Sequence, residues 1–200
     1  MDIQFLPQGI NDQITTHHRT PTMPPDTYNS RKWIILKKES EHPVPMLPRE
    51  VAQKQGIPFT AGRYLCRLAG DGNENKLAFM RIYKQIPQTG TEFESLRVRK
   101  AQAANAVDPD ELLALRELTD GGCTATPRLL GWRVAKQGED DLVPKGYIVY
   151  LVWEKVQGEP LSEGKFWCLP YDKRELIRQN FKKAYSFVTE HLDTICLGLT

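Results

Sequence analysis

The sequence predicts an α+β fold, in which an antiparallel sheet packs against one or two helices and further helices follow. Two apolar segments, residues 129–134 and 146–153, flank a charged and turn-rich stretch at residues 138–141. This pattern is typical of two antiparallel strands joined by a long loop. Elsewhere, apolar residues at three- and four-residue spacing predict amphipathic helices.

The first 29 residues predict a mobile arm, with Ile3 to Leu6 as a segment of it that can dock. They are rich in proline, threonine and histidine and poor in apolar side chains, so they cannot bury enough surface to offset the entropy lost on ordering. His17 and His18 stand in this arm without a cluster of cysteines or carboxylates. We therefore interpret them as a solvated pair rather than as half of a metal site.

The middle of the chain contains further strand signals. Residues 33–36 are a short apolar strand candidate, and residues 64–68 and 77–83 predict a hairpin. Asp71-Gly72 lies between the two hairpin strands, and Asp-Gly is favoured in tight turns.

Three stretches have the composition of longer helices. Residues 92–106 are rich in helix-forming residues. A second helix begins near Asp108, which can act as its N-cap, and it ends at Gly121-Gly122. A third helix runs from Asp172 to His191, about five turns. Its apolar stripe consists of Leu176, Ile177, Phe181, Ala184, Phe187 and Val188.

Composition narrows the class of protein. A formal net charge of +2 over 200 residues gives no field that would attract nucleic acid or an anionic membrane. The four cysteines are scattered without a CxxC pair, so neither a zinc site nor a disulfide framework is indicated. The start of the chain lacks the basic and apolar regions of a signal peptide, and no apolar run is long enough to span a membrane. We expect an intracellular protein, cytoplasmic or nuclear, with no nucleic-acid or membrane partner.

The segment YLVWEKVQGEPL, residues 150–161, resembles the fifth strand and hinge of the protein kinase and aminoglycoside phosphotransferase superfamily. The resemblance is closer to kinase-like proteins of filamentous fungi, in which CTATPRLLGW, LVPKGYIVYLVWEKVQGEPL and FWCLP before an Arg-rich helix occur in this order. It covers roughly residues 64–187. It implies a kinase-like N-terminal lobe at residues 30–157, with an antiparallel sheet and a helix. Residues 158–200 would then leave the hinge and form the first helices of an incomplete C-terminal lobe.

The resemblance implies a nucleotide site with ATP and Mg²⁺ as its cofactor. Arg81 occupies the place of the lysine that reaches the phosphates, although arginine is not equivalent to lysine there. The alternative is a strand-edge arginine with its head group in solvent. Glu111 is the carried-over helix glutamate that pairs with this position, and its alternative role is to cap the helix. The carbonyl of Glu154 and the N–H of Val156 would meet the adenine edge.

Two features weaken this nucleotide site. Gly56 and Gly62 are too far apart to form the GxGxxG turn that covers the phosphates, so they favour an ordinary connection. Trp153 would narrow the inner pocket. We therefore expect ATP to bind in the millimolar range or not at all.

The resemblance implies no catalytic and no metal-binding residues. His191-Leu192-Asp193 imitates the start of the catalytic loop, but Gly198 stands where the metal-binding asparagine belongs. We expect a catalytically inactive, truncated kinase-like protein, a pseudokinase, that acts by binding or scaffolding. The alternatives are a nucleotide-binding phosphotransferase fragment and an accessory protein of a fungal pathway without nucleotide chemistry. The Asp172 to His191 helix would lack its covering helices, which predicts a protein partner or a homo-oligomer through it.

Overall fold

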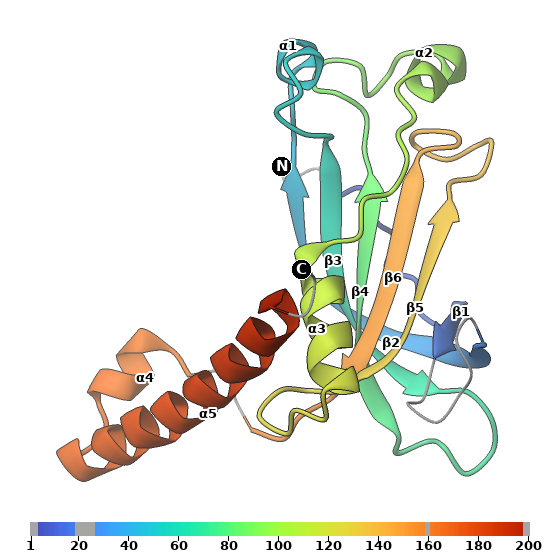
Figure 1. Cartoon of the computed structure of the whole chain (residues 1–200). Coiled ribbons are helices and arrows are strands. Elements are labelled where there is room, and N and C mark those ends of the chain that lie inside the picture. Colours follow the sequence, from blue (N-terminus) through green and yellow to red (C-terminus); the bar gives the residue numbers. More distant parts are fainter. Residues whose placement is uncertain (1–3, 19–26, 159–160, 198–200) are drawn as a thin grey trace. The chain divides into compact units, whose positions relative to one another are not determined.

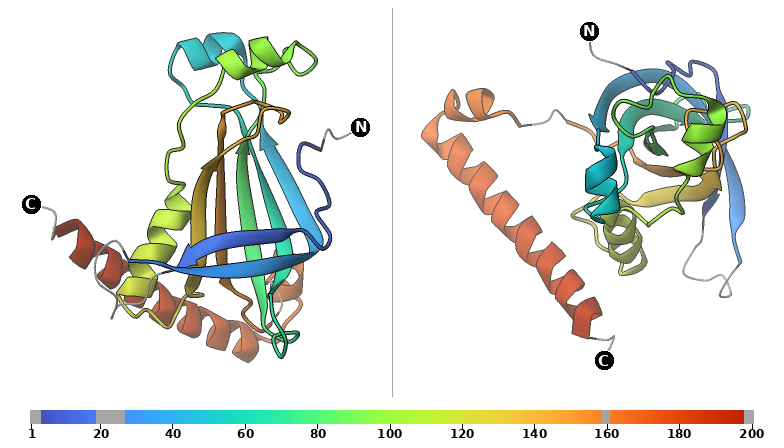
Figure 2. Two further views of the ribbon diagram at one scale, coloured as in Figure 1. Left: turned by 90° about the vertical axis from the view of Figure 1, so that its right-hand side faces the viewer. Right: turned by 90° about the horizontal axis from the view of Figure 1, so that it is seen from above.

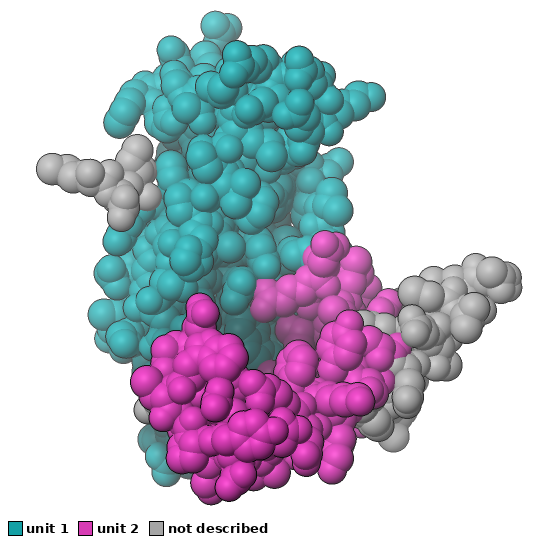
Figure 3. Space-filling view, turned by 90° about the vertical axis from the view of Figure 1, so that its left-hand side faces the viewer, with its two compact units in different colours: residues 1–109, 129–154 teal, residues 110–128, 155–200 magenta. Residues whose placement is uncertain are grey.

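The computed structural model describes residues 4–18, 27–158 and 161–197. The chain divides into two compact units (Figure 3). Unit 1 comprises Met1–Pro109 and Leu129–Glu154, and unit 2 comprises Asp110–Arg128 and Lys155–Thr200.

Unit 1 is built on a closed antiparallel barrel of six strands (Figures 1 and 2). The order around the barrel is β1-β2-β3-β4-β6-β5, and a pairing of His17 with Trp132 joins β1 to β5 and closes it. The strands are β1 (Gln13–His18), β2 (Asn29–Val44), β3 (Phe59–Leu68), β4 (Leu77–Gln85), β5 (Leu129–Lys136) and β6 (Tyr147–Glu154).

The predicted fold class is wrong. The sequence analysis expects a kinase-like small lobe with a hinge and a partial large lobe, whereas the sheet curls into a closed six-stranded barrel. The reason lies in two strands that the apolar pattern does not reveal. β1 comes from the expected arm, and β2 extends far beyond the visible signal at residues 33–36. Together they supply the strands that join the two sheet edges.

Both predicted strand pairs are confirmed, and one predicted helix is shorter than expected. The expected hairpin is present as β3 and β4, paired from Phe59 with Gln85 to Arg67 with Leu77. The expected pair on either side of the long loop is present as β5 and β6. The helix predicted at residues 92–106 is reduced to a short one, α2 (Leu96–Ala101), which Ser95 caps by accepting from the Val98 N–H. α1 (Pro48–Ala52) is also short and lies at the same end of the barrel (Figure 1).

The barrel interior is filled by side chains. Residues of each strand alternate between the two faces of the sheet, and the inward set forms one apolar cluster. A buried hydrogen bond of 2.9 Å from Trp33 Nε1 to Thr16 Oγ1 links β2 to β1 within it. The buried members are Leu6, Trp33, Ile35, Tyr64, Cys66, Ala78, Met80, Ile82, Tyr150 and Val152.

Unit 2 contains three helices, α3 (Asp110–Asp120), α4 (Glu163–Trp167) and α5 (Tyr171–Leu197). α3 and α5 confirm the helices predicted from Asp108 and from Asp172. α4 packs on α5 through cation–π contacts, with the Arg174 guanidinium 5.3 Å from the Trp167 ring and that of Arg178 5.2 Å from the Phe166 ring. Among the described residues, no helix has the length and apolar character needed to cross a membrane.

Candidate functional site

Arg81 lies on the outer face of the barrel. Its neighbours along β4, Met80 and Ile82, are buried in the core, so the alternation of the strand turns Arg81 outward. Its guanidinium lies 5.6 Å from the centre of the Trp153 ring on β6. The residue expected to contact phosphate therefore makes a cation–π contact with the residue expected to narrow the nucleotide pocket.

The other predicted nucleotide residues do not form a cluster with Arg81 within unit 1. Glu154 ends β6 and pairs with Ala78, an inward position, so it lies on the opposite face of the sheet from Arg81. Glu111 and Val156 belong to unit 2. Glu111 lies in the first turn of α3, and Val156 is 54% exposed in the segment that follows β6.

The predicted histidine pair is part of β1. His18 Nε2 lies 2.9 Å from Arg31 Nη2. Burial and the positive charge of Arg31 lower the pKa of His18 below its usual value. No group of three His, Cys, Asp or Glu side chains in the described ranges could hold a metal ion. His191 and Asp193 lie near the end of α5, and their side chains fall outside the description.

A buried polar site occurs where the sequence analysis expects none. We call its four side chains, Lys38, Glu41, Thr60 and Tyr64, the clamp. In a regular strand, residues three apart point to opposite faces. β2, however, has register shifts between Ile35 and Lys37 and between Lys38 and Ser40. These bulges turn both Lys38 and Glu41 inward, opposite Tyr64 and Gly62 of β3.

Lys38 and Glu41 form a buried ion pair, 2.6 Å between Nζ and Oε2, with side chains only 4% and 6% exposed. Two charges at this depth need hydrogen bonds beyond their own contact. For Glu41, one of these comes from the Thr60 hydroxyl, which donates to its Oε1 over 2.8 Å. The other partners lie in residues 4–7.

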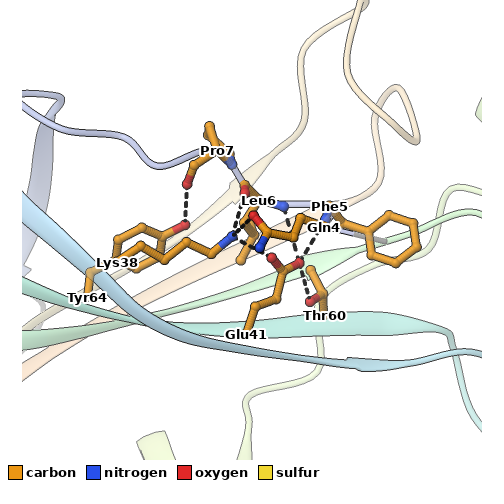
Figure 4. Close-up of polar contacts among 8 residues, drawn as sticks. All are labelled: Gln4, Phe5, Leu6, Pro7, Lys38, Glu41, Thr60 and Tyr64. Atoms are coloured by element: carbon orange, nitrogen blue, oxygen red, sulfur yellow. Dashed lines mark hydrogen bonds and ion pairs between the residues drawn. The ribbon is translucent and has the colours of Figure 1, made fainter. Parts of the chain in front are cut away.

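The backbone of residues 4–7 supplies those remaining partners (Figure 4). Glu41 Oε1 accepts from the N–H groups of Phe5 and Leu6 at 2.9 and 3.2 Å. Lys38 Nζ donates to the carbonyl of Leu6 at 2.7 Å. One more bond, 2.9 Å from the Tyr64 hydroxyl to the carbonyl of Pro7, fixes the end of the segment. The clamp therefore binds a short length of main chain that bends at Leu6.

One side chain of this segment enters the barrel. Leu6 is 5% exposed and belongs to the apolar core, whereas Gln4 and Pro7 are exposed. Gly62 makes room for it, because a Cβ at that position would lie 2.6 Å from Leu6 Cδ1. Gly62, part of the pair examined for a phosphate-binding turn, thus lies within β3 and faces the leucine.

The electrostatics of the clamp match its contacts. Burial by itself raises the pKa of Glu41, but hydrogen bonds from Lys38, Phe5 N–H and Thr60 outweigh it and hold the pKa below its usual value. Burial and the nearby charge of Glu41 raise the pKa of Tyr64. At neutral pH the clamp therefore presents a carboxylate acceptor together with ammonium and hydroxyl donors.

A pocket of about 680 Å³ adjoins the clamp. Lys38 and Glu41 contribute to its wall, and Gln4, Phe5 and Gln8 line it from the N-terminal side. The rest of the lining comes from the end of β2 and the loop before α2, namely Glu39, Ser40, Pro43, Pro45, Thr89 and Glu92. Residues 4–7 are thus reached from an open side.

A second buried network has an evident structural role. Lys84 lies on the opposite face of β4 from Arg81, as its spacing predicts, and binds Asp141 at 2.6 Å. Gln85 uses both ends of its amide to hold the chain that follows α2, through the Gln102 carbonyl at 2.7 Å and the Ala104 N–H at 3.0 Å. These contacts fasten loops to one end of the barrel.

Sequence reasoning missed the clamp because its charged residues look like surface residues. Lys38 and Glu41 stand in the polar stretch KKESE, in which no apolar period indicates a buried face. The available signal was the apolar group Ile3 to Leu6 in an otherwise polar start, followed by Pro7. No protein-family model, curated protein or solved structure matches this chain.

Proposed function

We propose that this chain is a non-catalytic protein-binding or scaffolding module, and that α5 supplies its contact surface. The observation that carries the proposal is the exposure of large apolar side chains along this helix. Leu176, Phe181 and Tyr185 are 52%, 68% and 60% exposed, and the Phe181 and Tyr185 rings stack with centres 5.9 Å apart. Exposed groups of this kind are typical of protein interfaces. The bound partner is a second copy of the chain or another protein.

The titratable groups support a role without acid–base chemistry. A general acid or base works best with a pKa near the working pH. The carboxyl groups with displaced pKa values, Glu41, Glu139 and Asp141, are held below their usual range. Burial raises the pKa of the Cys66 thiol and of the Tyr147 hydroxyl to about 12. All five keep their ordinary protonation state at pH 7.

The resemblance to kinase-like proteins leads to the same proposal. The resemblance carries over Arg81 as a phosphate contact but no catalytic residue, so it favours binding without phosphoryl transfer. We therefore expect no turnover of ATP with Mg²⁺ above that of a heat-treated sample.

Sedimentation velocity on the chain at tens of micromolar tests the contact surface. We expect the wild type to self-associate and Phe181→Glu to shift it toward monomer, because a charge opposes burial of the stripe. Ser186→Glu is the matched control, since it adds the same charge at an exposed position on the opposite face of α5. A wild type that sediments as a monomer, and binds an apolar dye no better than Phe181→Glu does, would contradict the proposal.

A further inference from the structure

We propose that the clamp is a recognition site for a short peptide of the form aromatic-Leu-Pro. Residues 4–7 fill this site in cis, and a partner protein carrying such a segment binds by replacing them. The site belongs to unit 1 and is distinct from α5, so this inference goes beyond the proposed function.

The clamp binds main-chain groups. It contacts the N–H groups of Phe5 and Leu6 and the carbonyls of Leu6 and Pro7. Every peptide has these groups, so main-chain hydrogen bonds supply the binding while a side-chain pocket provides selectivity. The clamp accepts no hydrogen bond from residue 7, which suits proline because it has no N–H to donate.

The site has a single pocket that selects a side chain, and Leu6 fills it. Leu6 is the only residue of the segment that is buried, and Gly62 leaves the space that its Cδ1 fills. Phe5 beside it is half-buried and lines the open pocket. Main-chain contacts at both ends of one buried leucine define a short motif.

The charges of the clamp allow residues 4–7 to be exchanged for a peptide of a partner protein. Lys38 and Glu41 contact each other directly at 2.6 Å, so their pairing does not need residues 4–7, and the adjoining pocket gives water access to replace the hydrogen bonds of that segment. The vacated site therefore keeps its charges in place. An incoming peptide finds the same donors and acceptors that the chain's own segment uses.

Fluorescence anisotropy tests the proposal, with a labelled synthetic peptide of residues 2–8, DIQFLPQ, and the full chain. Leu6→Asp should release the chain's own segment, because a carboxylate cannot occupy the apolar slot. The released site should bind the peptide. A tethered segment competes at an effective concentration on the order of 1 mM, so for a dissociation constant near 0.1 mM the wild type should bind about tenfold more weakly.

The controls test whether the peptide binds through the pocket that Leu6 fills. Gln13→Ala alters an exposed residue of the same arm that lies outside the pocket, and it should behave as the wild type. The same peptide with aspartate in place of leucine should not bind to any variant. Near-ultraviolet circular dichroism and a cooperative melt check that Leu6→Asp is folded, and Leu6→Ala replaces it if it is not.

Hydrogen exchange on the wild type needs no variant. Excess peptide should accelerate exchange at the Phe5 and Leu6 amides, because displacement removes their bonds to Glu41. Unchanged exchange, or a folded Leu6 variant that ignores the peptide at 1 mM, would overturn the proposal. Self-association that Leu6→Asp abolishes and Gln13→Ala retains would overturn it too, because the occupant would then be a second copy.

Discussion

Gly131→Ala tests the closure of the barrel, which separates the observed fold from the predicted open sheet. Gly131 is buried on β5 beside the position at which β1 closes the barrel. A Cβ there would collide with Thr16 Oγ1 and lie 3.0 Å from the carbonyl oxygen of His17. The second atom belongs to the backbone of β1 and cannot rotate away. The methyl group must therefore push β1 and β5 apart.

The expected loss of stability has two contributions. Overpacking of this kind costs about 2 kcal/mol. Displacing Thr16 weakens its hydrogen bond with Trp33, worth about 1 kcal/mol. With a urea slope of about 2 kcal/mol/M, the sum lowers the unfolding midpoint by about 1 to 1.5 M. The slope itself should stay the same if unfolding remains cooperative.

Tryptophan fluorescence follows unit 1 selectively in a Trp167→Phe background, because Trp33, Trp132 and Trp153 belong to that unit and Trp167 to the other. Gly138→Ala is the matched control, since the nearest atom to its added Cβ is at an ordinary 3.4 Å. Thr16→Ala should cost less in the Gly131→Ala background than alone, because it removes one of the colliding atoms. A Gly131→Ala midpoint equal to that of the control would show that β1 and β5 are not neighbours.

Two further predictions concern groups that the barrel buries. Glu41→Gln should destabilise the chain by about 3 kcal/mol at pH 7, because it leaves Lys38 buried without its counter-ion. The folded-state pKa of Glu41 is lowered, so its contribution is present above pH 4.5 and is lost as pH falls through that folded-state value. Urea titrations of both proteins should therefore converge in acid, and a constant difference would contradict the assignment. For cysteine, labelling in a Cys123→Ser/Cys196→Ser background should be fast at exposed Cys168 and should await unfolding at Cys66, whose pKa is raised to about 12 by burial. Rapid labelling that survives Cys168→Ser would show that the core is open.

The elements that the sequence predicts are those defined by neighbouring residues. The β3–β4 hairpin follows from its Asp71-Gly72 turn and its alternation, and α3 follows from its N-terminal cap signal. β1 has no such local signal, because QITTHH holds a single apolar residue. It is a strand because β2 and β5 pair with it across the chain. Pairing of this range depends on context that propensity does not contain.

The resemblance placed Arg81, Glu111, Glu154 and Val156 in one site. It did so by analogy with the sheet of a kinase-like lobe, whereas the sheet of this chain closes into a barrel. For Arg81 and Glu154 the structure shows how the two side chains are oriented, whereas the predicted contact of Glu154 is made by its carbonyl. They lie on neighbouring strands but project to opposite faces, since Arg81 is an outward residue and Glu154 pairs with inward Ala78. Order along the chain cannot reveal this, because a register change of one residue exchanges the faces of a strand.

The bulges of β2 connect the closure of the barrel with the clamp. A bulge bends and twists its strand, and a 16-residue strand in a six-stranded barrel must bend. The same two irregularities turn Lys38 and Glu41 toward the interior, where each charge requires partners. Lys38 and Glu41 pair with each other, and main-chain groups of residues 4–7 supply further hydrogen-bond partners. Residues 4–7 are therefore held in place by a consequence of curvature, and the same curvature creates a site whose chemistry fits a short peptide that offers a leucine to Gly62.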